Sequence, residues 1–413
     1  MHKLYPLFIL VLFFIAFLIR LQIIYETPRS NYKLDLQIYQ AGGVLITNGI
    51  SPYDYSDKPA LREVLRFQST DPWIRENQDR WNYYASGNLP LNLLFFGLLS
   101  RIWHNPIFYR LAFAFFESLL SILVFVYVAE NWKVSSKDAI GRCLRFVCTL
   151  LLGVLSLILL QWGTKFPQDK GIQILLILAA VVCAGSNKRI LRTYFGVMLL
   201  GLSIAFKGLG VFVVPYYLSK VYKRDGFSVK SLGLFLVIIA VSTMVWFIPY
   251  HDDVKFMMLY RIQQNSSGLP GHSSMWLQVA SFIPNAWNLF RIGLMIFVFI
   301  LSVVGLLKRR LSILNFCGVW LLVFTAAYLL AGSLDRTHIG ILLSTLFMGT
   351  QSIAAGFILT FFYVILGVVS FWFDKGWQME ESLFILVFVI VYIISLTVRS
   401  FNLHKYFLKK KTV

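Results

Sequence analysis

Residues 4–25 read LYPLFILVLFFIAFLIRLQIIY, an apolar run in which Arg20 is the only charged residue. A helix of about 20 residues is long enough to cross the hydrocarbon core of a bilayer. Similar runs follow along the 413 residues, and 58% of the chain is hydrophobic while 14% is charged. Soluble globular proteins are about 45–50% apolar and about 25% charged. The sequence therefore predicts an all-α, polytopic membrane protein and excludes an ordinary soluble enzyme or a disordered chain.

The net charge of +19 lies mostly in short segments between the apolar runs. In a soluble protein such a charge would favour nucleic acid. Between membrane spans, however, Lys and Arg mark the loops on the inner side and meet anionic lipids. We therefore expect membrane lipids and no nucleic acid as partners. The predicted inner loops carry Lys133, Lys137, Arg142, Arg145, Lys188, Arg189, Arg192, Lys220, Lys223, Arg224, Lys230, Lys308, Arg309 and Arg310.

The distribution of basic residues favours about 12 membrane-spanning helices with both chain ends inside. The predicted crossings are 4–25, 107–130, 146–162, 171–186, 192–207, 209–222, 231–249, 286–307, 311–331, 338–354, 355–373 and 382–400. We expect the first to be a retained helix and the chain to form one multi-pass domain over 1–413 in the plasma membrane. A long first outer loop, 26–87, and a second outer loop, 250–285, lie between crossings.

Two segments do not fit a simple count of crossings. Residues 89–103 are apolar but too short for a full span, so we interpret them as interfacial or re-entrant. The uncharged stretch 338–373 forms either one long helix or a tight hairpin that turns near Gly349 to Ser352, and the parity of the crossings favours the hairpin.

The first outer loop begins with NYKLDLQIYQAGGVLITNGISPYDY over residues 31–55. Its apolar residues recur at helical spacing, which predicts an amphipathic helix at the membrane surface. Asn48-Gly49 ends this helix, and a turn follows. Asp35 falls in the first helical turn, where its carboxylate either takes a proton from an incoming hydroxyl or merely favours the positive end of the helix dipole.

The segment from Asp35 to Asp54 resembles the first outer loop of GT-C superfamily glycosyltransferases. It is most similar to bacterial mannosyltransferases that use polyprenyl-phosphate mannose. In that family an acidic residue at the start of the loop is the catalytic base, followed by an Ala/Leu helix and a Gly-x-x-Pro-Tyr turn. The resemblance therefore implies that Asp35 is the general base and that the fold is GT-C-like.

Weaker similarities follow in the family's order. They lie at Tyr83-Tyr84 with Leu89-Pro90-Leu91, at Gly163 with Gln168-Asp169, and at Gly201-Leu202 with Lys207 and Pro215. One proline of the family's Tyr-Pro-Pro-Leu element is missing. At the second element the family's Asn is replaced, and Lys165 and Lys170 are added. The residues that the resemblance assigns to substrate binding are Tyr39, Tyr53, Asp54, Tyr83, Gln168 and Asp169.

Three basic residues are candidates for binding the phosphate of a lipid-linked donor. Lys207 lies in the polar break between two apolar runs, where it either binds phosphate or extends to the lipid headgroups. Arg336 and His338, in the tetrad Asp335-Arg336-Thr337-His338, suit phosphate binding. The alternative for the tetrad is a short polar turn in which Asp335 and Arg336 pair.

Other ionisable residues are open to two interpretations. Glu117, inside an apolar run, either pairs with a basic residue such as Arg110 or Lys207 or carries a proton in a transporter. Asp252 and Asp253 follow a histidine, but three consecutive residues do not easily converge on one ion. We expect no metal site and no required cofactor, and keep a divalent cation open at those two aspartates.

The resemblance implies an inverting glycosyltransferase that moves a hexose, most often mannose, from a polyprenyl phosphate to a hydroxyl of a glycolipid or glycan on the outer face. No Walker or Rossmann phosphate-binding motif occurs, and a lipid-linked donor requires neither. The alternatives are a flippase or transporter of lipid-linked saccharides, in which Glu117 and Lys207 are charges along the pathway, and a surface-polysaccharide polymerase or ligase.

Overall fold

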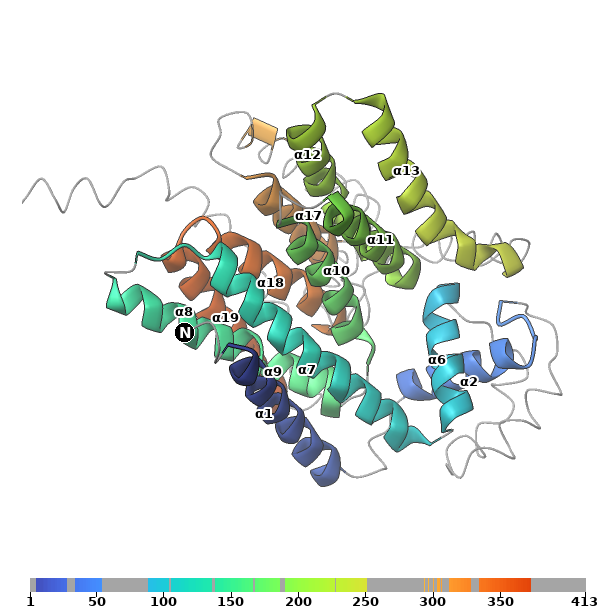
Figure 1. Ribbon diagram of the computed structural model, residues 1–413. Helices are drawn as coiled ribbons and strands as arrows, with labels where there is room; N and C mark the ends of the chain where they lie inside the picture. Colours follow the sequence, from blue (N-terminus) through green and yellow to red (C-terminus); the bar gives the residue numbers. More distant parts are fainter. Residues whose placement is uncertain are drawn as a thin grey trace, which may run out of the picture. The chain divides into compact units, whose positions relative to one another are not determined.

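The helices that the computed structural model describes are drawn as coiled ribbons in Figure 1. The described residues are 5–27, 34–53, 88–103, 105–135, 138–165, 168–185, 190–226, 228–250, 312–327 and 334–372, with single positions at 293, 296, 300, 303, 304 and 306. Within them every regular element is a helix and no strand occurs, so the all-α prediction is confirmed for this part of the chain. Two compact units form, Met1–Leu123 with Leu159–Gly268 and Val124–Ile158 with Leu269–Val413.

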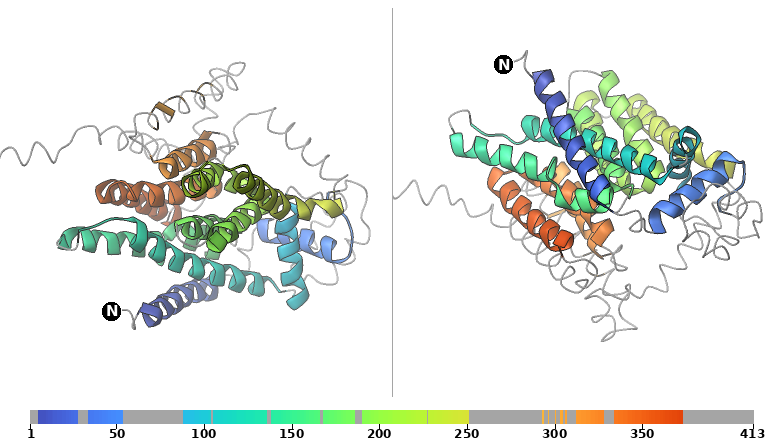
Figure 2. Two further views of the ribbon diagram at one scale, coloured as in Figure 1. Left: turned by 45° about the horizontal axis from the view of Figure 1, so that its top comes forward. Right: turned by 90° about the horizontal axis from the view of Figure 1, so that it is seen from below.

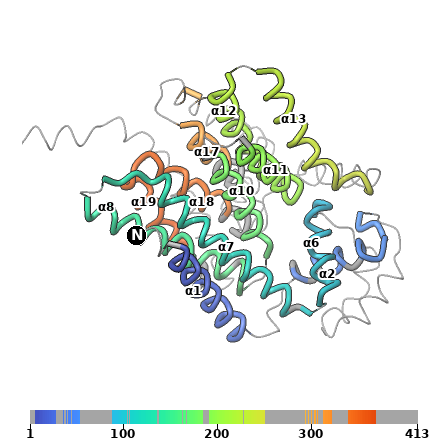
Figure 3. The backbone as a smooth tube through the Cα atoms, viewed as in Figure 1, coloured from blue at the N-terminus to red at the C-terminus, as the bar shows by residue number. Residues whose placement is uncertain are grey.

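The first unit contains the helices that follow the N-terminus and those after Leu159. They are α1 (Tyr5–Glu26), α2 (Leu34–Thr47), α6 (Pro90–Ile102), most of α7 (Pro106–Asn131), the π-helix η2 (Leu160–Lys165), α10 (Lys170–Gly185), α11 (Ile190–Lys207), the 3₁₀-helix η3 (Leu209–Val213), α12 (Val214–Asp225), α13 (Val229–Met244) and the 3₁₀-helix η4 (Val245–Tyr250). Helix α11 is central, because it contacts α6, α10 and α13. The chain reverses between α12 and α13 (Figure 3).

The second unit contains the rest of α7 together with α8 (Ala139–Leu152), most of α9 (Leu157–Leu159), α17 (Ile313–Ala327), α18 (Leu334–Gly349) and α19 (Ile353–Trp372). Helix α18 packs against both α17 and α19. Trp132 is buried there, and its indole Nε1 donates to the carbonyl of Leu346 at 2.9 Å. A Cβ added at Gly349 would overlap the Trp132 ring. Glycine at this position therefore leaves room for the indole.

Four described helical stretches are long and apolar enough to cross a membrane. They are Pro6–Glu26, Ile107–Asn131, Ala139–Leu159 and Val229–Tyr250. Many of their large apolar side chains are exposed, including Phe14, Leu18, Val237 and Val241. A surface of this kind is stable against lipid tails but not against water. The four stretches therefore indicate a membrane protein, as predicted.

The predicted crossings and the observed helices agree closely at several places and differ at two. Helix α8 begins at Ala139, not at 146, because Asp138 caps it by accepting a hydrogen bond from the amide of Gly141 at 2.8 Å. Arg142 and Arg145 therefore lie on a helix and not in a loop. Helix α18 begins at Leu334, not at 338, so the tetrad from Asp335 to His338 lies at the start of a helix and not between two crossings, and the alternative of a short polar turn is wrong.

The predicted hairpin within 338–373 is confirmed, since α18 ends at Gly349 and α19 begins at Ile353. The apolar segment 89–103 forms the short helix α6, of 13 residues. The crossing 382–400 and the second outer loop, 250–285, lie outside the described residues except for Tyr250. So do nearly all positions of the crossing 286–307.

The helix predicted in the first outer loop is confirmed as α2, and it packs against α6 (Figure 2). A Cβ on Gly43 would lie 2.8 Å from the backbone nitrogen of Gly97. The two helices therefore touch through their backbones, as small residues permit. Helix α2 ends as predicted: Gly49 has φ 71°, and the amide of Ile50 donates to the carbonyl of Leu45 at 2.9 Å. These are features of a Schellman cap.

Candidate functional site

Asp169 joins three other segments of the first unit through its buried carboxylate. Its Oδ1 accepts a hydrogen bond from the hydroxyl of Tyr39 on α2 at 3.0 Å and forms an ion pair with the ammonium of Lys207 on α11. Its Oδ2 accepts from the side-chain amide of Asn92 on α6. Asp169 and Asn92 are fully buried, and Tyr39 is nearly so. A carboxylate satisfied by donors of three helices fixes their relative positions.

Lys207 stands where α11 ends, because Gly208 adopts φ 83° and the regular helix cannot continue. A lysine in the last turn is favoured by the negative end of the helix dipole. The ammonium also lies 5.8 Å from the centroid of the Tyr39 ring. The side chain of Lys207 keeps 20% of its surface exposed while Asp169 has none. Lys207 is thus the member of the pair that a ligand can reach.

We expect Gly208→Ala to destabilise the protein by about 1–2 kcal/mol, because an alanine at positive φ is strained. No heavy atom lies within 4 Å of a Cβ built at Gly208, so the loss measures backbone strain alone. Thermal unfolding of the purified protein in detergent checks this. Gly233→Ala is the matched control: its Cβ also meets nothing, but it lies inside α13, and alanine there should stabilise by up to about 1 kcal/mol. Equal effects at both sites would contradict the expectation.

Asp169 immediately precedes α10, and its carbonyl accepts from the amide of Gln173 at 3.2 Å. Burial opposes ionisation of its carboxyl. The charges of Lys207 and Lys170, with hydrogen bonds from Lys207 and Asn92, outweigh that effect and hold the pKa of Asp169 below its ordinary value. The carboxylate is therefore ionised at neutral pH and stays paired with Lys207.

An apolar cluster packs around Tyr39, one of the donors to Asp169. The Tyr39 ring stacks on that of Phe96, with centroids 4.3 Å apart and planes 9° from parallel. The buried residues of this cluster are Leu36, Tyr39, Phe96, Leu99, Tyr109, Phe113, Ile172 and Phe206. Packing of this kind keeps the Tyr39 hydroxyl aimed at Asp169 and limits the water that reaches it.

Of the predicted site residues, the structure brings Tyr39, Asp169 and Lys207 into contact, and Gln168 is buried beside Asp169 in the chain. Tyr53 lies in a second cluster with Ile46 and Leu93, where its hydroxyl donates to the carbonyl of Asn88 at 2.8 Å. It anchors the turn after α2 to the start of α6.

For the remaining predicted site residues, the structure describes either the backbone alone or nothing. Asp35 is in the first turn of α2, as predicted, and Arg336 and His338 are in the first turn of α18; the side chains of all three lie outside the description. Asp54, Tyr83, Asp252 and Asp253 lie outside the described residues. Among the described residues no group of three His, Cys, Asp or Glu side chains could hold a metal ion.

Sequence reasoning missed Asn92 and Arg20. Asn92 is a polar residue in the first turn of a mainly apolar segment, and Arg20 is the single charge of the first apolar run, so each carried a signal. Arg20 pairs with Glu117, its Nε lying 3.0 Å from Oε2. The prediction that Glu117 pairs with a basic residue is confirmed, and the partner observed is Arg20, not one of the two residues given as examples. Arg110 instead donates to the carbonyls of Thr164 and Ile24.

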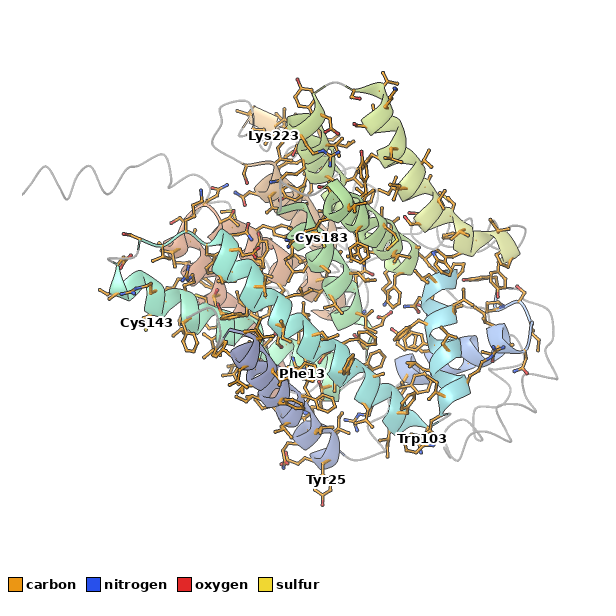
Figure 4. All side chains as sticks on the ribbon, in the orientation of Figure 1. Phe13, Tyr25, Trp103, Cys143, Cys183 and Lys223 are labelled. Atoms are coloured by element: carbon orange, nitrogen blue, oxygen red, sulfur yellow. The ribbon has the colours of Figure 1, made fainter. Side chains whose placement is uncertain are left out.

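Side chains at the ends of α1 and α6 also bear on the membrane. Tyr25 projects away from the end of α1 and is 88% exposed, and Trp103 at the end of α6 is 52% exposed (Figure 4). Exposed Tyr and Trp at helix ends are typical of the membrane–water interface.

Comparisons with known protein families, curated proteins and solved structures find no match to this chain.

Proposed function

We propose that this protein is a GT-C-type glycosyltransferase of the plasma membrane, acting at its outer face. In this proposal it transfers a hexose, with mannose as the sugar, from a polyprenyl phosphate to a hydroxyl of a glycolipid or glycan. Asp35 would be the general base. The fold would have about 12 spans, with the outer loop 26–87 carrying the base. A divalent cation at Asp252 and Asp253 stays open, and no other cofactor is required.

The observation that carries the proposal is the chain of contacts from Lys207 through Asp169 to Tyr39. Lys207 is the candidate for the donor phosphate, and Tyr39 lies on α2, four residues after Asp35. Residues four apart lie on the same side of a helix. The candidate base and the candidate phosphate ligand thus belong to elements that Asp169 holds together, although 172 positions separate Asp35 from Lys207 in the sequence.

The predicted topology is consistent with these contacts. The threading from basic residues assigns α2, the segment around Asp169 and the end of α11 to the outer side, and these three segments meet. In the second unit it assigns Trp132 and the turn after Gly349 to the inner side, and these also meet. In each unit, segments that contact one another are assigned to the same side of the membrane. This agreement supports the predicted threading.

The chemistry follows from the charges. The acceptor oxygen attacks the anomeric carbon from the face opposite the phosphate, the bond from that carbon to the phosphate oxygen breaks, and the departing phosphate keeps the electron pair. The configuration at carbon is inverted. Asp35 takes the proton of the acceptor hydroxyl. Lys207 stabilises the negative charge on the phosphate, with Arg336 and His338 as further candidates, because an ammonium has three donors and can hold a carboxylate and a phosphate together.

The flippase alternative is less well supported by the same contacts. A charge on a transport pathway must meet the substrate, but Glu117 is 1% exposed and its Oε2 is taken by Arg20 and Thr164. The polymerase or ligase alternative is distinguished by its donor, a lipid-linked oligosaccharide or polysaccharide in place of a single sugar on a polyprenyl phosphate.

The test is transfer of radiolabelled mannose from polyprenyl-phosphate mannose in membrane vesicles of the two orientations. We expect labelled product only with the full protein present and with donor on the originally outer face. Consumption of donor from the inner face alone would overturn the topology. Movement of lipid-linked saccharide between leaflets without consumption of any polyprenyl-phosphate sugar would overturn the transferase in favour of the flippase.

A further inference from the structure

A second charged pair, Arg20 with Glu117, is buried between two of the helices that are long enough to cross a membrane. Arg20 on α1 is fully buried and Glu117 on α7 is 1% exposed. The guanidinium of Arg20 also donates to the carbonyl of Ala16 at 2.9 Å. Burying two charges is costly unless their geometry is fixed, and apolar side chains would join two helices at less cost. The pair therefore requires a role beyond packing.

Glu117 holds both ends of the segment that carries Asp169. Its Oε2 accepts a hydrogen bond from the hydroxyl of Thr164 on η2 at 2.8 Å. A Cβ built at Gly163 would overlap its Oε1, and one at Gly171 would lie 2.5 Å from its Cγ. Glycine at these two positions lets the side chain lie directly against the backbone before and after Asp169.

The backbone on either side of Asp169 is therefore held by Glu117, which does not itself contact Asp169's partners Tyr39, Asn92 or Lys207 in the contacts described above. Arg20 sets where the Glu117 carboxylate lies, and Glu117 sets the separation of η2 from the start of α10. Arg110, on the same helix as Glu117, adds a hydrogen bond to the carbonyl of Thr164 at 3.1 Å. Asp169, between the two glycines, can reach Tyr39, Asn92 and Lys207 together only if its backbone stays in this place.

We propose that Arg20 and Glu117 are positioning residues: their ion pair holds the described residues before and after Asp169, 163–165 and 168–171, so that Asp169 keeps the ammonium of Lys207 in place. Neither residue touches the donor or the acceptor. The consequence for sugar transfer rests on the proposed function, but the control of Lys207 by Glu117 does not.

The test measures the reactivity of Lys207 in the purified full-length protein. An ammonium held by a carboxylate is acylated slowly, and a released one faster, so a water-soluble acylating reagent with peptide mass spectrometry reports on the pair. We expect Glu117→Gln to raise the labelling rate of Lys207 about tenfold, the effect of losing one hydrogen bond to a charged group. Asp169→Asn should do the same, and the two substitutions together should add little more.

Glu130→Gln is the matched control, because Glu130 is exposed and lies on the same helix. It should leave the labelling of Lys207 unchanged. Gly171→Ala is the second variant: it keeps both charges and favours helix formation, yet displaces Glu117, and it should also raise the labelling.

Unchanged labelling of Lys207 in folded Glu117→Gln or folded Gly171→Ala would overturn the proposal. Failure of both variants to fold would overturn it too, since the pair would then be a requirement for folding. Because labelling needs no sugar donor, its outcome is separate from that of the proposed function. Where transfer is detected, Glu117→Gln should raise KM for the donor more than it lowers kcat, as expected for a displaced phosphate ligand.

Discussion

Asp35→Asn is expected to lower the rate of sugar transfer by about two to four orders of magnitude, the contribution of a full general base. Asparagine keeps the size and the hydrogen-bonding shape of the side chain but cannot accept the proton of the acceptor hydroxyl. Helix α2, which begins at Leu34 and is held through Tyr39 and its cap at Gly49, should form as before. The loss should therefore appear in kcat, with KM for the donor little changed.

Glu26→Gln is the matched control for this substitution. Glu26 is the last residue of α1, at the predicted outer side, and is exposed; its Oε1 accepts from the amide of Gln22 at 2.6 Å. The control removes the same charge nine positions before Asp35 and should leave transfer within about twofold, since exposed charges contribute little. If Asp35→Asn retained transfer to the same extent, Asp35 would only favour the positive end of the α2 dipole.

Much of the fold could be predicted because its signals are local. The apolar runs before Glu26 and after Ile107, the stop at Asn48-Gly49 and the turn after Gly349 are properties of a few neighbouring residues, and each is observed. The errors occur where a polar residue near a helix start decides the boundary. With Asp138 as its cap, α8 begins seven residues before the predicted crossing. Helix α18 begins four residues before its predicted crossing, so the polar tetrad lies at the start of that helix.

The site could be predicted only in part, because its pairings join distant positions. The resemblance named Tyr39, Asp169 and Lys207 but not their mutual contacts, which span 130 and 38 positions. Glu117 was recognised as costly, yet its partner lies 97 positions away on the first helix. A charge in an apolar run shows that a partner exists; which one it is depends on the packing of helices, and single-residue patterns do not contain that information.

Lys207→Met should destabilise the protein by about 3 kcal/mol, because it leaves the fully buried Asp169 without the cation closest to it. Methionine keeps the length and apolar stem of the lysine, so the loss reports on charge. Asp169→Asn combined with Lys207→Met should recover most of the loss, since no buried charge then lacks its partner. Additive effects of the two substitutions, measured by chemical unfolding in detergent, would contradict a coupled pair.

Lys220→Met is the control, because the ammonium of Lys220 lies 5.3 Å from the Tyr216 ring centroid and its loss should cost at most about 1 kcal/mol.

The dependence of stability on acid pH is an independent check of the pairing between Asp169 and Lys207. The pKa of Asp169 lies below its ordinary value of 3.8, so the stability from its ionised form is complete above that value. It is lost as the pH falls through the lowered pKa of the folded state. The stability difference between the native protein and Asp169→Asn should therefore stay constant from neutral pH to about pH 4 and shrink only below it. A difference that shrank already near pH 6 would mean that the charges of Lys207 and Lys170 do not outweigh burial.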